Sequence, residues 1–129
     1  MRFKKFAVLA LVLLALPACR RAKIYNPEPF KALSATSKTQ KVIRAALAGR
    51  GWRIVKEEPG EIHAAYVRRS LVARIVITYA DTVTIKYEGS ENLKHGIDKY
   101  GDEVIHSRYN KWIETLVSDI NRNMLLASD

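Results

Sequence analysis

Four short runs between residues 52 and 88 alternate apolar and polar side chains, which is typical of β-strands with one buried face. Pro59-Gly60 and Ala80-Asp81 leave room only for tight turns, so we expect consecutive strands to pair antiparallel as a meander. The alternation indicates that one face of the sheet is covered while the other contacts water. The runs span residues 52–57, 61–69, 71–79 and 82–88, and their predicted inner faces carry Ile62, Ala64, Tyr66, Leu71, Ala73, Ile75, Ile77, Tyr79, Val83, Ile85 and Tyr87.

Two amphipathic helices are predicted to cover this sheet. The longer repeats apolar residues at three- and four-residue spacing from Ile105 to Met124, with Asp102 as its expected N-cap. The shorter begins with Ser37-Lys38-Thr39-Gln40, which fits a capping box, and Gly49 is expected to end it. The predicted fold class is therefore α+β, a two-layer αββββα sandwich whose four-stranded antiparallel meander is covered on one face by helices.

The first nineteen residues have the pattern of an export signal. Arg2, Lys4 and Lys5 precede an uncharged apolar run from Phe6 to Leu16, which is shorter than the roughly 20 residues of a membrane-spanning helix. Leu16-Pro17-Ala18-Cys19 closes this run with the only cysteine of the chain. The segment resembles the signal peptide of bacterial lipoproteins, whose lipobox reads Leu, small, small, Cys. An ordinary secretory signal with a coincidental cysteine is the alternative interpretation.

The lipoprotein resemblance implies that the protein is located in the cell envelope and is anchored there by lipid. It implies that residues 1–18 are cleaved off, and that Cys19 is diacylated on sulfur and then acylated on its new amine with fatty acids such as palmitate. Because Arg20 rather than Asp follows the cysteine, the resemblance favours the outer membrane, facing the periplasm. The predicted domains are the signal peptide 1–18, a lipidated N-terminus and tether 19–36, and a single α+β domain 37–129.

The charge of the chain is basic and uneven. Loss of residues 1–18 lowers the net charge from +9 to +6, and residues 20–74 hold 13 basic but only 4 acidic residues. Such a half suits an anionic lipid, lipopolysaccharide or an acidic protein, whereas an exported protein rarely meets nucleic acid. A basic surface with no dedicated partner is the alternative. The residues expected to form an electrostatic dock are Lys38, Lys41, Arg44, Arg68, Arg69 and Arg74.

Few residues suggest catalytic or metal chemistry. After acylation no thiol remains, and the spacing of His63, His95 and His106 matches no metal motif, so we expect no metal and no cofactor. Ser90, His95 and Asp98 share a predicted loop and supply the ingredients of a hydrolase, but no nucleophile motif frames them. Phosphate-binding glycine motifs are absent from the sequence.

A second resemblance covers about residues 40–125. Ser90-Glu91-Asn92-Leu93 and the stretch from Ile105 to Ile113 read as a Ser-x-Asn-Leu loop and an Ile-His-x-x-Tyr-Asn-x-Trp-Ile helix. These motifs resemble small, uncharacterised proteobacterial envelope lipoproteins, which implies an αββββα domain but no particular activity. A polar set is expected either to pin the loop onto the helix or to line a groove for a peptide or glycan; its members are Tyr87, Ser90, Asn92, His106 and Asn110.

The sequence therefore predicts a non-enzymatic, periplasm-facing membrane lipoprotein that acts as a binding or adaptor module for another envelope component, most simply a protein. One alternative is a small envelope hydrolase that uses the Ser90–Asp98 loop. The other is an anionic-lipid or lipopolysaccharide-binding protein, which requires the basic residues to lie on one contiguous face.

Overall fold

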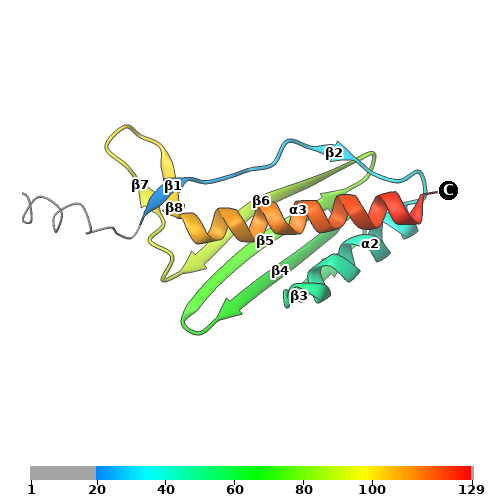
Figure 1. Cartoon of the computed structure of the whole chain (residues 1–129), viewed down its shortest axis with the longest axis horizontal. Helices are drawn as coiled ribbons and strands as arrows, with labels where there is room; N and C mark the ends of the chain where they lie inside the picture. Colours follow the sequence, from blue (N-terminus) through cyan, green and yellow to red (C-terminus); the bar gives the residue numbers. More distant parts are fainter. Residues whose placement is uncertain (1–19, 129) are drawn as a thin grey trace, which may run out of the picture.

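The computed structural model describes residues 20–128, so the predicted signal peptide and Cys19 lie outside the described residues. Two helices lie side by side on one face of a five-stranded antiparallel sheet (Figure 1). The helices are α2 (Thr36–Gly49) and α3 (Ser107–Ala127), and the sheet has the order β2-β6-β5-β4-β3. Its strands are β2 (Phe30–Lys31), β3 (Arg53–Glu58), β4 (Glu61–Arg68), β5 (Leu71–Tyr79) and β6 (Thr82–Glu91).

A second, smaller sheet stands at one end of the long axis of the molecule (Figure 1). It has the antiparallel order β1-β8-β7, with β1 at Arg21–Lys23, β7 at Gly96–Ile97 and β8 at Glu103–His106. Because α3 begins directly after β8, this small sheet also fixes where the long helix starts.

The prediction of an α+β fold with helices on one face of an antiparallel sheet is confirmed, and β3 to β6 form the expected meander. The four-stranded sheet and the simple αββββα order are wrong. β2 adds a fifth strand beside β6, and β1, β7 and β8 form a sheet that no sequence period indicated. Strands of two to four residues are too short to establish a period of two, so only their pairing reveals them.

The tether expected over residues 20–36 is instead attached to the domain. Ala22 pairs with Ile105 in the small sheet, and Phe30 pairs with Val83 in the large one. Between these strands the backbone N–H of Tyr25 donates to the side chain of Asn110. The prolines of this segment allow an extended conformation, and the segment uses that conformation to pair with strand edges.

Both helix starts also differ from the prediction. α2 begins at Thr36, where the N-cap residue Ala35 has no polar side chain to cap the helix, and the Gln40 amide donates to Glu57 instead of completing a capping box with Ser37. α3 begins at Ser107, where the His106 ring accepts a hydrogen bond from the Arg108 N–H, and the expected cap Asp102 precedes β8. Gly49 is the last residue of α2, and the left-handed turn residue is Gly51 (φ 84°).

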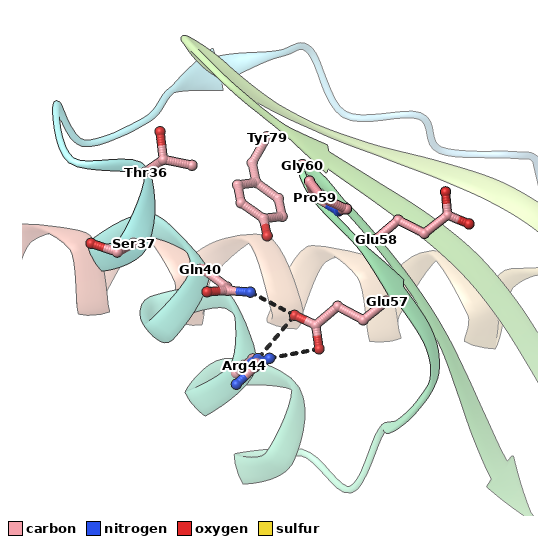
Figure 2. A pocket seen from close by; sticks show the side chains of 9 residues that line it. All are labelled: Thr36, Ser37, Gln40, Arg44, Glu57, Glu58, Pro59, Gly60 and Tyr79. Carbon is pink, nitrogen blue, oxygen red and sulfur yellow. Dashed lines mark hydrogen bonds and ion pairs between the residues drawn. The ribbon is translucent and has the colours of Figure 1, made fainter.

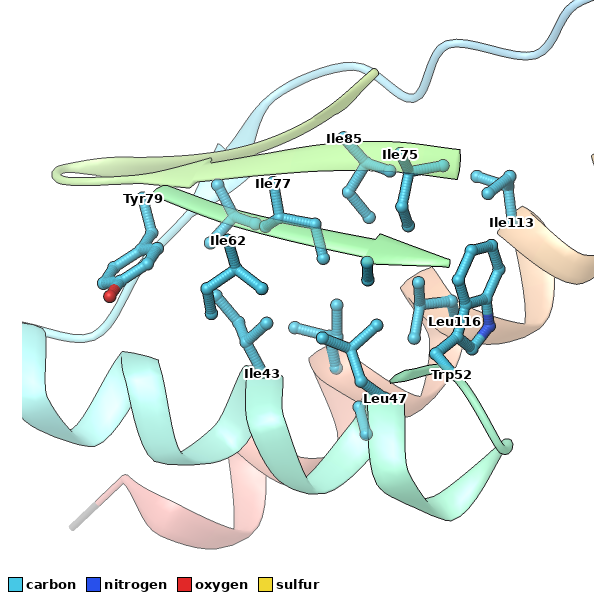
Figure 3. Close-up of a cluster of buried hydrophobic side chains, with 14 of the residues drawn as sticks. Ile43, Leu47, Trp52, Ile62, Ile75, Ile77, Tyr79, Ile85, Ile113 and Leu116 are labelled. Carbon is cyan, nitrogen blue, oxygen red and sulfur yellow. The ribbon is translucent and has the colours of Figure 1, made fainter. Parts of the chain in front are cut away.

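The core lies between the helices and the large sheet (Figure 3). The predicted inner faces of β4, β5 and β6 all point toward the helices, and Ile75 and Ile77 are fully buried. From the helices, Ile43, Leu47 and Leu116 meet them (Figure 3). This packing leaves the opposite sheet face without a covering layer from residues 20–128.

Candidate functional site

The predicted polar set makes separate contacts rather than one groove. The Tyr87 hydroxyl lies 2.6 Å from the Ser90 hydroxyl, whereas the Asn92 amide donates to the Ser70 carbonyl at 2.7 Å. Asn110 accepts from the Tyr25 N–H and donates to the Lys23 carbonyl, and His106 caps α3. Asn92, His106 and Asn110 thus each hold a different stretch of backbone, whereas Tyr87 and Ser90 contact one another.

The loop is joined to the start of α3 by its backbone. The His106 N–H donates to the Leu93 carbonyl at 2.7 Å, and the Leu93 side chain is buried. The neighbouring rings of Tyr87 and Tyr109 meet edge to face with centroids 5.5 Å apart. Burial raises the pKa of Tyr109, so this hydroxyl stays protonated.

The three residues of the hydrolase alternative have different partners. Ser90 contacts the Tyr87 hydroxyl, and His95 lies 2.7 Å from Glu103. The Asp98 carboxylate accepts from the backbone N–H groups of Tyr100 and Asp102. Among residues 20–128, no three histidine, cysteine, aspartate or glutamate side chains are placed to hold a metal ion.

The predicted electrostatic dock is dispersed. Arg44 is bound to Glu57, and Arg74 to Glu91 on the uncovered sheet face. Lys38 and Lys41 lie in the first half of α2, whereas Arg68 and Arg69 lie where β4 ends. The length of β4, about 23 Å at 3.3 Å per residue, separates that end from the β3–β4 turn beside Arg44.

A hollow of about 620 Å³ surrounds this Arg44–Glu57 contact (Figure 2). Arg44 donates to both carboxylate oxygens of Glu57, and Gln40 donates to one of them. These hydrogen bonds, with that from Arg44 the main cause, lower the pKa of Glu57. Arg44 and Glu57 neutralise each other, and Glu58 pairs with Lys56 outside the hollow, so these polar groups serve to join α2 to β3.

A different hollow, of about 570 Å³, gathers basic residues that sequence reasoning had not grouped. It lies between the β4–β5 turn and the first turns of α3, and we call it the arginine–tryptophan hollow. A smaller cavity of about 170 Å³ adjoins it and shares Arg68 and Trp112 with it. The arginine–tryptophan hollow is lined by Arg68, Arg69, Ser70, Leu71, Arg108 and Trp112.

Three aromatic rings line the smaller cavity, and one of them, Trp112, also lines the arginine–tryptophan hollow. The ring centroids of Trp52 and Tyr66 are 5.3 Å apart, and Tyr66 meets Trp112 edge to face at 4.8 Å. Trp52 is only 5% exposed, so it supports this lining from within, while the half-buried Trp112 faces both cavities. Packed rings of this kind provide a rigid apolar surface.

The arginines at this site differ in their partners. Arg50, beside the smaller cavity, donates to both carboxylate oxygens of Asp119, at 2.6 and 3.3 Å, and lowers its pKa. In contrast, within residues 20–128 no ion pair joins Arg68, Arg69 or Arg108 to a carboxylate. These three guanidinium groups therefore retain their full capacity to bind an anion.

Local geometry explains why these residues meet. Arg68 pairs with Leu71 across a two-residue turn in which Arg69 has φ 58°, and Asn92 holds the turn through the Ser70 carbonyl. Arg108 and Trp112 are four residues apart and so lie on one side of α3. That spacing was the available sequence signal for this site.

No protein-family model, curated protein or solved structure matches this chain. Within residues 20–128, neither helix combines the length and the apolar character needed to cross a membrane.

Proposed function

We propose that this chain is a non-enzymatic lipoprotein, anchored by acylated Cys19 and facing the periplasm from the outer membrane, whose domain binds another envelope component. The export-signal pattern of residues 1–19 supports the location and the anchor. The arginine–tryptophan hollow is the binding surface, and its three arginines, which have no carboxylate partner among residues 20–128, are the observation that carries the proposal.

The chemistry of the hollow favours an anionic ligand. Guanidinium groups hold phosphate or carboxylate through paired N–H donors, and Trp112 adds a flat apolar contact beside them. The side chains that line this hollow are basic, aromatic, aliphatic or hydroxyl-bearing, a set that suits holding an anionic ligand better than moving a proton.

In-cell photocrosslinking tests this proposal. A photoreactive residue at Ser70, which lines the hollow, should capture an envelope component, whereas one at Lys86 on the opposite sheet face should not. Replacing the three hollow arginines should reduce capture, and high salt should do the same. Equal capture at both positions, or capture indifferent to the arginines, would contradict binding at this surface.

Mass spectrometry of the mature protein tests the anchor separately. The expected chain begins at Cys19 and carries three acyl groups. A Cys19→Ser variant should accumulate without acyl mass. A mature chain that begins elsewhere and carries no lipid would refute the lipoprotein part of the proposal.

A further inference from the structure

The proposed function leaves the ligand of the hollow open, and the fold restricts it. Resting on the proposed anchor at Cys19, we propose that the arginine–tryptophan hollow holds the phosphate headgroup of an anionic lipid in the same leaflet that holds Cys19. In this arrangement the small β1-β8-β7 sheet stands on the membrane, and the molecule has one fixed orientation.

The first argument is that the chain joins the fold immediately after the proposed anchor, without a linker in between. Arg20 directly follows Cys19, and its carbonyl accepts from the Ser107 N–H at the start of α3. From the next residue onward, β1 pairs with β8, and the Ile24 N–H donates to the Glu103 carbonyl. Adjacent Cα atoms are about 3.8 Å apart, so acyl chains on Cys19 would hold this end of the domain at the headgroup layer.

The second argument is the charge of that end. Arg20, Arg21, Lys94 and Lys99 belong to it, in addition to the three arginines of the hollow. Its acidic side chains are fewer: Asp102 lies 3.5 Å from Lys23, Glu103 contacts His95, and Asp98 accepts from backbone N–H groups. Basic groups near an anionic leaflet each add to its attraction for the protein.

The third argument is the exposed apolar tip of the β7–β8 hairpin. Ile97 is 64% exposed and Tyr100 is 77% exposed, and Lys99 lies 5.2 Å from the centre of the Tyr100 ring. The hairpin and β1 lie at the same end of the long axis (Figure 1). A tyrosine and an isoleucine beside lysines are typical of a segment that rests in the membrane interface.

The hollow lies at this same end. Arg108 is two residues from His106, the partner of Arg21 in the small sheet, and the β4–β5 turn projects toward the same end of the long axis (Figure 1). An anchored domain therefore presents Arg68, Arg69 and Arg108 to lipid phosphates at high local concentration. A protein ligand would have to enter between this surface and the membrane, which is why we favour the lipid.

Tryptophan fluorescence provides the test. The acylated protein is purified from membranes and reconstituted in phosphatidylcholine vesicles that contain a lipid with a quenching, spin-labelled headgroup, with or without phosphatidylglycerol. The chain has two tryptophans, and Trp52 is buried, so quenching should come from Trp112 and disappear in Trp112→Phe. We expect stronger quenching in the phosphatidylglycerol vesicles.

Arginine variants make the test specific. Arg68→Gln, Arg69→Asn and Arg108→Gln, with Asn chosen to suit the positive φ of residue 69, should each reduce the preference for anionic vesicles about fivefold. A matched control removes three positive charges elsewhere, with Lys31→Gln, Lys41→Gln and Lys86→Gln, and should retain the quenching. The hollow triple variant combines the three arginine substitutions, and near-native circular dichroism of it and of the control would show that folding is intact.

Two results would overturn the inference while leaving the proposed function standing. One is equal quenching in the hollow triple variant and the control variant. The other is an in-cell Ser70 crosslink whose adduct is a protein rather than a phospholipid. A mature protein without acyl mass would instead refute the anchor, and with it the proposed function.

Discussion

At the residue scale, His63 on the uncovered sheet face lies between two carboxylates. One ring nitrogen lies 3.0 Å from Glu88 and the other 2.5 Å from Glu61. An imidazolium donates from both nitrogens, so the charged ring satisfies both carboxylates. Hydrogen bonds to Glu88 and then to Glu61 raise the pKa of His63 from its ordinary 6.5.

This contact predicts a pH-dependent stability. Because the folded-state pKa of His63 is raised, its contribution is complete below the ordinary value and is lost as the pH rises through the folded value. We expect His63→Gln to lower the free energy of unfolding by about 0.5 kcal/mol near pH 6 and by less near pH 9. Urea denaturation at both pH values measures this, with Glu88→Gln as a partner variant. A deficit that is the same at both pH values would contradict it.

The availability of a charge at one residue depends on partners that are distant in the sequence. Arg44 and Arg74 appeared equivalent to Arg68 in the basic half of the sequence, but their carboxylate partners are 13 and 17 residues away. Which arginine meets which carboxylate depends on the strand register and on where the helix packs, and neither can be read from the amino-acid composition. The role of Arg68 and Arg69 in an electrostatic dock stays a prediction, and the sequence did not group Arg108 and Trp112 with them.

At the element scale, the segment of residues 20–31 is attached to the domain rather than free, and we call it the strap. Its strand β1 covers three residues, and the position of β1 depends on pairing with β8 and on the Asn110 side chain beyond it. Asn110 lies on α3, so one amide group joins the N-terminal segment to the longest helix. Loss of this contact should free the strap without loosening the core.

Asn110→Ala is the variant that tests the strap. It removes two hydrogen bonds, one to the Tyr25 N–H and one to the Lys23 carbonyl, at a cost of about 2 kcal/mol for local opening. That corresponds to a roughly thirtyfold faster amide exchange at Ile24, whose N–H keeps its own acceptor, the Glu103 carbonyl, in this variant. Asn121→Ala, an exposed position on the same helix, is the control and should leave this exchange unchanged. Unchanged exchange in Asn110→Ala would show that β1 pairing alone holds the strap.

Long strands were predicted more accurately from the sequence than short ones. β4, β5 and β6 have eight to ten residues, enough to establish alternation, and their inner faces were predicted correctly. The sequence placed Ile105 in the long helix, whereas the structure places it in β8. The error arose because Ile105 precedes Tyr109 by four residues, which is also the spacing of a helical repeat. The short strands β1, β2 and β7 depend on partners across the fold, which local patterns do not specify.

At the scale of the whole molecule, the uncovered sheet face and the end that carries β1 differ in how many of their charged side chains form ion pairs within the protein. On the uncovered sheet face, Lys56 pairs with Glu58, Arg74 with Glu91, and His63 with two glutamates. The end that carries β1 and the arginine–tryptophan hollow instead has several basic groups with no carboxylate partner among residues 20–128. Attraction to an anionic surface should therefore be greatest at that end.

Lengthening the connection between anchor and fold tests this orientation. Ten flexible residues inserted between Cys19 and Arg20, beginning with arginine so that the residue after the cysteine is unchanged, reach about 17 Å. In neutral vesicles the direct connection alone holds the hollow at the headgroups, so quenching of Trp112 should fall sharply. In phosphatidylglycerol vesicles the arginines should restore part of it. The same ten residues added after Asp129 are the control and should change neither signal. If the lengthened protein is quenched as strongly as the original in neutral vesicles, the direct connection to Cys19 does not set the orientation. Attraction of the hollow and of the β7–β8 hairpin to the membrane would then have to account for the orientation.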